Sequence, residues 1–426
     1  MADGSPPGDA DHTIAANVAL GVFKRSVGGG KSMRELENIM AKIPGRRAAM
    51  RMIGMASLGA TLASGESLTG RPERVVYVGT YTSAGSRGIY RLRFNPETGG
   101  LSDDGLAAEA VNPSYLAVDP AAGHLFAVNE VATLNEQPGG GLSAFSISRR
   151  TGQLTPLNQV SSGGAAPCYI SIDPTGRYVM AANYSGGNLI VVPVDSKGRL
   201  GKASDREQHI GTGGNPQRQS GPRAHCIRFT PDRRHIVAVD LGIDRVIIYR
   251  WDSKRGQLLP NEPAEFRTRS GAGPRHIDFH PNGRFAAIIN ELDSTVVSCR
   301  WDGVRGELTE IHSVSTLPAG FSATNYCADI HFHPGGQFVY GSNRGHDSLA
   351  IWRVDAETGQ LSLVGHESTG GRNPRNFVID PTGKWLLAAN QGSDSIVVFQ
   401  IDLSSGRLTR TNGSLRVSMP VCLKFG

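Results

Sequence analysis

The sequence lacks the motifs of several common enzyme and binding classes. Neither G-x-S-x-G nor H-E-x-x-H occurs, which argues against an α/β-hydrolase serine and against a zinc protease. Lysine and arginine form no long run and no basic helix, although the net charge is +6, so nucleic-acid binding is not expected. No apolar segment is long enough for a transmembrane helix, and stable membrane insertion is not expected either.

Cysteine is also scarce. The five cysteines are odd in number, widely separated and never arranged as C-x-x-C, which argues against a disulfide framework and a structural zinc site. Four of them lie in apolar, strand-like segments, where a buried thiol behaves as a small hydrophobic group. The five are Cys168, Cys226, Cys299, Cys327 and Cys422.

The first part of the chain differs from the rest. Residues 1–45 are polar and rich in small side chains, and Arg46-Arg47 then precedes a mildly apolar stretch that ends near Gly65. Paired arginines before such a stretch are typical of a twin-arginine export signal. A leader with a chance arginine pair is the alternative. We therefore expect residues 1–70 to be an N-terminal extension, with an export-type segment at 46–65.

The remainder, residues 71–426, is built from repeats. Glycine (54) and proline (24) are abundant and suit short strands joined by turns. One pattern recurs: a strand, a tight turn and a second strand that ends in Asn or Asp. It occupies residues 112–130, 166–184, 221–241, 273–291, 325–344 and 373–391. Counting from the equivalent Gly79, the residues that end these second strands are 50, 54, 57, 50, 53 and 47 positions apart.

Each repeat continues with a third strand, a G-x-L turn and a polar fourth strand. Four antiparallel strands in each of seven units predict an all-β fold, a seven-bladed β-propeller. The first unit lacks its first strand, whereas the tail Met419–Phe425 matches a first strand with nothing after it. We therefore expect the C-terminal strand to complete the N-terminal blade and close the ring.

In such a blade the first strand lines the central channel. Residues that enter the first strand and residues that leave the second then lie at one end of the channel. Cationic side chains concentrate there, on one side of the axis: Arg218, Arg223, His225, Arg275, His276, Arg344 and Arg375. Guanidinium groups match carboxylates and phosphates, so we expect a small anionic ligand at this end.

Glu291 is a carboxylate among these cations. It should stay ionised beside arginines and could accept a proton from a water molecule or a substrate carbon. A structural ion pair with Arg275 is the alternative. For His225 and His276 the alternative is a packed or turn-capping imidazole.

Metal sites are weakly indicated. His331 and His333 share one face of a strand and form a weak metal candidate. The Asn and Asp residues that end the second strands could hold a cation on the axis, but capping of the same turn in each repeat is the stronger interpretation. We expect no metal and no cofactor.

From residue 74 onward the chain resembles the lactonase family of seven-bladed propellers. This family includes propeller-type 6-phosphogluconolactonases and carboxy-cis,cis-muconate cyclising enzymes. The resemblance rests on VYVGTYT, NEV…GGGLSAFSI, SSGGAAPCYISIDPTGRYVMAANY, RQSGPRAH, DLGIDRV, GAGPRHIDFHPNGRFAAIINEL, SNRGHDS, GGRNPRNFVIDPTGKWLLAANQ and the closing PVC.

The resemblance implies an active site formed by His225, Arg275, Glu291 and Arg344. One position departs from the family pattern P-H-x-H, because Arg223 replaces its first histidine. Positive charge is kept there, but a neutral proton acceptor is lost.

Together these features predict a carboxylic ester hydrolase that opens a sugar lactone, 6-phosphogluconolactone first of all. Glu291, aided by His225, would activate water and Arg275 would stabilise the oxyanion. Substrate-binding roles fall to Arg344, Arg218, Arg223, His276 and Arg375. The alternatives are muconate cyclisation and a non-catalytic exported ligand-binding propeller. The resemblance implies a cytoplasmic protein, whereas a genuine signal at 46–65 implies export.

Overall fold

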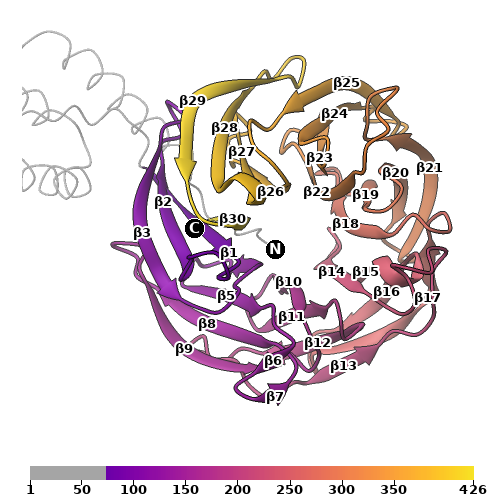
Figure 1. Ribbon diagram of the computed structural model, residues 1–426. Helices are drawn as coiled ribbons and strands as arrows, with labels where there is room; N and C mark the ends of the chain where they lie inside the picture. Colours follow the sequence, from indigo (N-terminus) through magenta and orange to yellow (C-terminus); the bar gives the residue numbers. More distant parts are fainter. Residues whose placement is uncertain (1–72) are drawn as a thin grey trace, which may run out of the picture. The chain divides into compact units, whose positions relative to one another are not determined.

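The computed structural model describes residues 73–426. Their strands form seven four-stranded antiparallel sheets around a common axis (Figure 1), which confirms the predicted seven-bladed β-propeller. The expected leader with Arg46-Arg47 lies outside the described residues.

In six of the sheets the strands follow one another in chain order from the channel outward. The first three of these sheets along the chain comprise β4 (Leu116–Val118), β5 (His124–Asn129), β8 (Gly141–Ile147) and β9 (Leu154–Ser161); β10 (Pro167–Ile172), β11 (Tyr178–Asn183), β12 (Asn188–Pro193) and β13 (Asp205–Gln208); β14 (Ala224–Phe229), β15 (His235–Asp240), β16 (Arg245–Asp252) and β17 (Gln257–Arg267).

The next three sheets repeat the same order. They comprise β18 (Pro274–Phe279), β19 (Phe285–Asn290), β20 (Thr295–Asp302) and β21 (Glu307–Ser315); β22 (Tyr326–Phe332), β23 (Phe338–Arg344), β24 (Ser348–Val354) and β25 (Leu361–Ser368); β26 (Pro374–Ile379), β27 (Trp385–Asn390), β28 (Ser395–Ile401) and β29 (Leu408–Arg416).

The seventh sheet joins the two ends of the described chain. From the channel outward it comprises β30 (Pro420–Phe425), β1 (Arg74–Thr80), β2 (Gly88–Phe94) and β3 (Leu101–Glu109). The described part also contains a small hairpin, β6 (Thr133–Leu134) and β7 (Gln137–Pro138), and the short 3₁₀ helices η1 (Leu241–Ile243) and η2 (Gln391–Ser393).

Ring closure depends on β30. It pairs antiparallel with β1, with Val78 opposite Leu423, and it packs against β26 and β4 of the neighbouring blades. The Leu423 amide also donates to Asn376 Oδ1 in β26 at 2.7 Å. The predicted completion of the N-terminal blade by the C-terminal strand is therefore confirmed.

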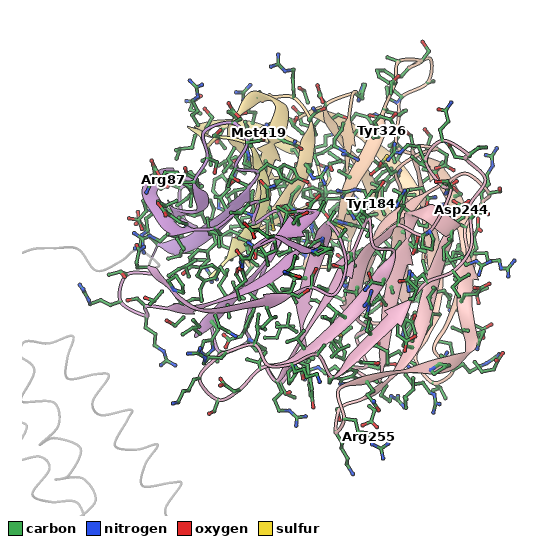
Figure 2. All side chains as sticks on the ribbon, turned by 60° about the horizontal axis from the view of Figure 1, so that its bottom comes forward. Arg87, Tyr184, Asp244, Arg255, Tyr326 and Met419 are labelled. Atoms are coloured by element: carbon green, nitrogen blue, oxygen red, sulfur yellow. The ribbon has the colours of Figure 1, made fainter. Side chains whose placement is uncertain are left out.

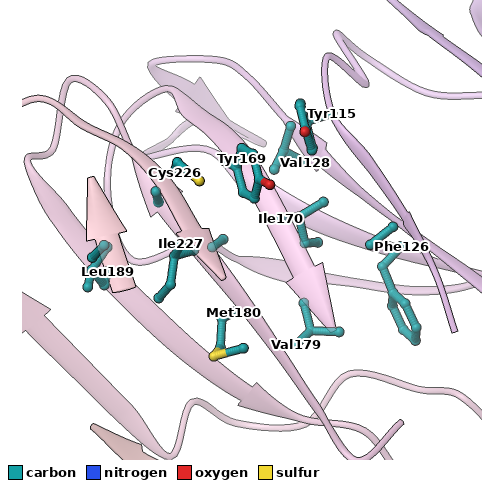
Figure 3. Packing of buried hydrophobic residues seen from close by; sticks show 14 of the residues in the cluster. Tyr115, Phe126, Val128, Tyr169, Ile170, Val179, Met180, Leu189, Cys226 and Ile227 are labelled. Atoms are coloured by element: carbon teal, nitrogen blue, oxygen red, sulfur yellow. The ribbon is translucent and has the colours of Figure 1, made fainter. Parts of the chain in front are cut away.

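The core lies between the blades. Strands β18 and β19 are buried at every position, whereas the outermost strand β21 is mostly exposed or half-buried, because neighbouring blades cover both faces of the inner strands. Figure 3 shows this packing, with Phe126, Ile170 and Ile227 contributed by three consecutive blades. All five cysteines are buried free thiols.

Some of the Asn residues that end second strands connect their blade to the segment that leads in from the blade before. Four of them donate from Nδ2 to a main-chain carbonyl of that segment: Asn129 to Val111 (2.8 Å), Asn183 to Ser162 (2.9 Å), Asn343 to Thr316 (2.8 Å) and Asn390 to Thr369 (3.1 Å). These contacts support the capping interpretation. Within residues 73–426 no group of three or more His, Cys, Asp or Glu side chains could hold a metal ion.

The two ends of the channel differ in residue content. Figure 2 shows Tyr184, Tyr326 and Met419 near one end and Arg255 at the other. Tyr184 follows a second strand and Tyr326 begins a first strand, as expected for the end at which these positions meet. We call this end the channel mouth. In the described part of the chain, no helix is long and apolar enough to span a bilayer.

Deleting residues 419–426 should open the ring. The deletion removes β30, exposes the edge of β1 and uncovers apolar surface of β26 and β4, so we expect loss of the cooperative thermal transition. Circular dichroism during heating measures this. The control is Lys424→Ala, which keeps the main-chain pairing and should melt like the parent. A soluble deletion variant with a single sharp transition would contradict the closure.

Candidate functional site

Glu291 lies at the centre of a charged cluster at the channel mouth. Its side chain is 8% exposed and contacts three arginines. Arg218 Nη2 donates to Oε1 at 2.7 Å, while Arg275 Nε and Arg344 Nη2 donate to Oε2 at 3.1 and 2.8 Å. We call these four residues the Glu291 cluster.

Three neighbouring blades supply the Glu291 cluster. Arg275 lies in β18 and Glu291 directly follows β19, and the register of this hairpin places both at the mouth. Arg344 ends β23 of the next blade, and Arg218 lies in the loop before β14 of the preceding blade. The repeat thus brings together residues far apart in sequence.

The cluster has an excess of positive charge. Burial alone would raise the pKa of Glu291, but Arg344, Arg275 and Arg218 outweigh it and lower this pKa to about 2. Burial also lowers the pKa of Arg344 to about 10; Glu291 opposes this shift, and Arg275 and Arg375 add to it. Three guanidinium groups against one carboxylate can attract a further anion.

His276 lies beside the cluster as a neutral imidazole. Its Nδ1 is 2.7 Å from Asp329 Oδ1, and its Nε2 is 3.3 Å from Arg275 Nη1. Burial and the charge of Arg275 lower the pKa of His276 to about 3, although Asp329 opposes the shift. The proton of the neutral ring therefore lies on Nδ1, facing Asp329, and Nε2 accepts from Arg275.

His225 packs against this histidine. The two ring centroids are 5.2 Å apart in an edge-to-face arrangement. Burial, with the charges of Arg275 and Arg375, lowers the pKa of His225 well below its ordinary range. Its buried Nδ1 has no hydrogen-bond partner among the described residues. His225 is thus close to the cluster and contacts it through His276.

The two histidines of the weak metal candidate have separate structural partners. His331 Nε2 is 3.0 Å from Asp329 Oδ2, which also accepts from Asn376 Nδ2. Burial would lower the pKa of His331, but Asp329 and Asp278 raise it to about 9. His333 Nε2 contacts the Gly383 carbonyl at 2.8 Å, in a turn at the other end of the channel. The pair is therefore not gathered into one site.

Arg375 and Arg223 lie at the mouth but outside the Glu291 cluster. The Arg375 guanidinium is 5.4 Å from the ring centre of Tyr81, and that of Arg223 is 5.7 Å from the ring centre of Tyr184. Tyr184 links the second pair to the cluster, because its hydroxyl accepts from Arg218 Nη2 at 3.5 Å. The four predicted binding arginines thus border the mouth, and three of them, Arg218, Arg223 and Arg375, lie against aromatic rings.

Comparison with known proteins shows to which family the chain belongs. The family described as "Lactonase, 7-bladed beta-propeller" matches residues 75–425. The chain belongs to this lactonase family. A 6-phosphogluconolactonase of Bacillus subtilis is 38% identical over 349 residues, which cover 82% of this chain and 97% of that relative.

Solved structures agree with membership in the lactonase family. A periplasmic gluconolactonase of Pseudomonas aeruginosa has a TM-score of 0.78 and 34% identity, and the match covers 83% of this chain and 99% of that one. A structure from Bacteroides fragilis has a TM-score of 0.78 and 37% identity, covering 85% and 100%. The family and these names support a hydrolase that acts on lactones.

The repeat pattern missed several residues of the candidate site. Tyr184 and Tyr326 flank Arg218, whose guanidinium is 5.3 Å from the ring centre of Tyr326. Asp329 orients His276. Tyr184 and Tyr326 lie at the repeat positions that meet at the mouth, which is a signal that could have found them. Asp329 lies within a strand, and the sequence carries no comparable signal for it.

Replacing Glu291 with glutamine should make stability depend less on pH. The pKa of Glu291 is lowered from 4.5 to about 2 by folding, so its charge stabilises the fold above about pH 4.5, and this contribution is lost as pH falls toward 2. The shift corresponds to about 3 kcal/mol, or about 4 °C in Tm for a domain of this size.

Thermal unfolding of the parent and Glu291→Gln between pH 3 and 8 tests this. We expect the parent to melt higher near neutral pH and the difference to shrink toward pH 3. The matched control is Glu357→Gln, which removes a carboxylate that is 85% exposed and pairs with Arg284, and it should change little. A difference in Tm that stays constant down to pH 3 would contradict the assigned ion pairs.

Proposed function

We propose that this chain hydrolyses a sugar lactone with an anionic group, specifically 6-phospho-glucono-1,5-lactone, to give 6-phosphogluconate. The Glu291 cluster is the observation that carries the proposal, because three arginines around one carboxylate suit an anionic substrate at the channel mouth. The name of the Bacillus subtilis relative supports the choice of substrate.

Arg218 and Arg344 are suited to hold the phosphate. Their side chains are 33% and 15% exposed, so each can reach a ligand from the mouth while the protein excludes part of the water. Guanidinium groups bind phosphate oxygens through two parallel hydrogen bonds. Arg223 and Arg375 add positive charge at the same end of the channel.

Arg275 is suited to the lactone carbonyl. It is the most deeply buried arginine of the cluster, with 2% of its side chain exposed. Nε donates to Glu291, and Nη1 contacts Ala328 O and His276 Nε2, while no described residue accepts from Nη2. A fixed donor in a desolvated site stabilises the oxyanion that forms when water attacks the carbonyl.

Glu291 has a different task in this proposal from the one predicted from sequence. All three guanidinium groups donate to it, and with a pKa of about 2 it is a weak proton acceptor. We assign to it the positioning of Arg218, Arg275 and Arg344. It holds the three guanidinium groups close together, in positions from which they can also bind an anionic substrate.

A free sugar lactone is the second candidate substrate. The Pseudomonas aeruginosa neighbour, a periplasmic gluconolactonase, favours it. Both candidates require the same attack on a lactone carbonyl. They differ in whether Arg218 and Arg344 contribute to binding.

Separate substitutions distinguish these roles. Arg344→Ala should raise KM for the phosphorylated lactone by about tenfold or more and affect glucono-1,5-lactone much less. Arg275→Ala should lower kcat by about 100-fold or more for any lactone that the parent hydrolyses. Steady-state rates on both lactones, with spontaneous hydrolysis subtracted, measure these effects.

The control is Arg255→Ala, which alters a 75% exposed arginine at the opposite end of the channel (Figure 2) and should behave like the parent. Parental kcat in Arg275→Ala would remove the oxyanion assignment. Equal effects of Arg344→Ala on the two lactones would favour the unphosphorylated substrate. A parent without activity on either lactone would overturn the proposed function.

A further inference from the structure

A second carboxylate, Glu130, faces the channel from a different blade. It follows β5, three blades before the hairpin that carries Glu291, and the two blades lie on different sides of the ring (Figure 1). Glu130 occupies the same place in its repeat as Glu291 does. The two residues are thus equivalent in sequence and different in surroundings.

Glu130 is held by hydroxyl groups. Tyr81 donates to Oε2 at 2.9 Å, and Ser114 Oγ donates to the same oxygen. No described residue donates to Oε1, and Glu130 forms no ion pair with a described cation. One oxygen therefore orients the carboxylate, and the other remains available as an acceptor.

A small cavity connects Glu130 with the Glu291 cluster. Its volume of about 10 Å³ is room for one water molecule. It is lined by Tyr115, Val421 and the side chains of Ser114, Glu130, Cys168, Arg275, His276 and Arg375. Arg275 borders this cavity and also pairs with Glu291, so a carbonyl bound at Arg275 would lie next to a water molecule held in the cavity.

The other proton acceptors near this cavity are weak. Glu291 accepts from three arginines and has a pKa of about 2, and the pKa of His276, whose Nε2 already contacts Arg275, is about 3. Burial raises the pKa of Cys168 well above its ordinary value, so this thiol stays protonated. Glu130 is the cavity-lining group with both a carboxylate and an unoccupied acceptor oxygen.

We propose that Glu130 is the general base of the reaction, acting through Oε1 on a water molecule held in this cavity. The inference rests on the proposed lactone hydrolysis. The water O–H bond breaks as its oxygen bonds to the lactone carbonyl carbon, and the proton passes to Glu130. The ring C–O bond then breaks, and Glu130 returns the proton to the departing ring oxygen, which becomes the hydroxyl group of the acid.

The two carboxylates thus have different roles in the reaction. Glu291 holds the cations that bind and polarise the substrate, and Glu130 moves the proton. Tyr81 and Ser114 are positioning residues, because both donate to Oε2 of Glu130, and Ser114 also lines the cavity. Arg375, stacked on Tyr81, fixes that tyrosine against β26.

Kinetics of Glu130→Gln test this proposal. Loss of a general base should lower kcat by about 100-fold or more and leave KM near that of the parent, because no binding cation changes. The matched control is Glu136→Gln, which alters an exposed residue of the β6–β7 turn in the same blade segment. Formate should restore part of kcat in Glu130→Ala, but not in Arg275→Ala.

Each outcome is decisive. Parental kcat in a folded Glu130→Gln protein overturns the role of Glu130 and leaves the proposed function standing, whereas a parent inactive on both lactones overturns both. A rise in KM with unchanged kcat would make Glu130 a binding residue and also overturns the proposal. If Glu130→Gln does not melt cooperatively, Glu130→Asp is the second variant. Its shorter side chain moves the carboxylate away from the water molecule, so kcat should fall while KM stays unchanged.

Discussion

The pairing of β30 with β1 is the constraint on which the channel depends. It joins the two ends of a ring whose blades otherwise follow one another along the chain. Because β30 lies between β26 and β4, it also places Arg375 and Ser114 around the same small cavity, and Val421 of β30 forms part of the cavity wall. Docking of β30 therefore both closes the ring and completes the wall of the cavity.

The ring makes possible a concentration of charge that a small fold would not tolerate. Burying several arginines together is costly unless carboxylates lie within hydrogen-bonding distance. Glu291 meets this need for three guanidinium groups, and Asp278 does so for Arg228 deeper in the channel. The apolar core between the blades stabilises the fold, so the channel-facing residues are not needed for packing and can take part in chemistry.

Much of the architecture is predictable from sequence, and the site only in part. The strand-ending residues from Asn129 to Asn390 recur at nearly constant intervals, and a repeat converts directly into blades. The same repeat places Arg275 and Glu291 at the mouth. It cannot say which side chains of adjacent blades meet: the contact of Glu130 with Tyr81, or of His276 with Asp329, depends on side-chain direction. The charge state of Glu291 likewise follows from neighbours in other blades.

The seventh blade also has a consequence for how the molecule folds. Strand β1 pairs with β30, which lies more than three hundred residues further along the chain. Contacts between residues so far apart in sequence raise the mean sequence separation of contacts, and a larger separation slows folding. Until β30 arrives, β1 presents an unpaired edge that can recruit strands of other molecules. The time between synthesis of β1 and docking of β30 is therefore the period in which the edge of β1 is open to pairing with other chains.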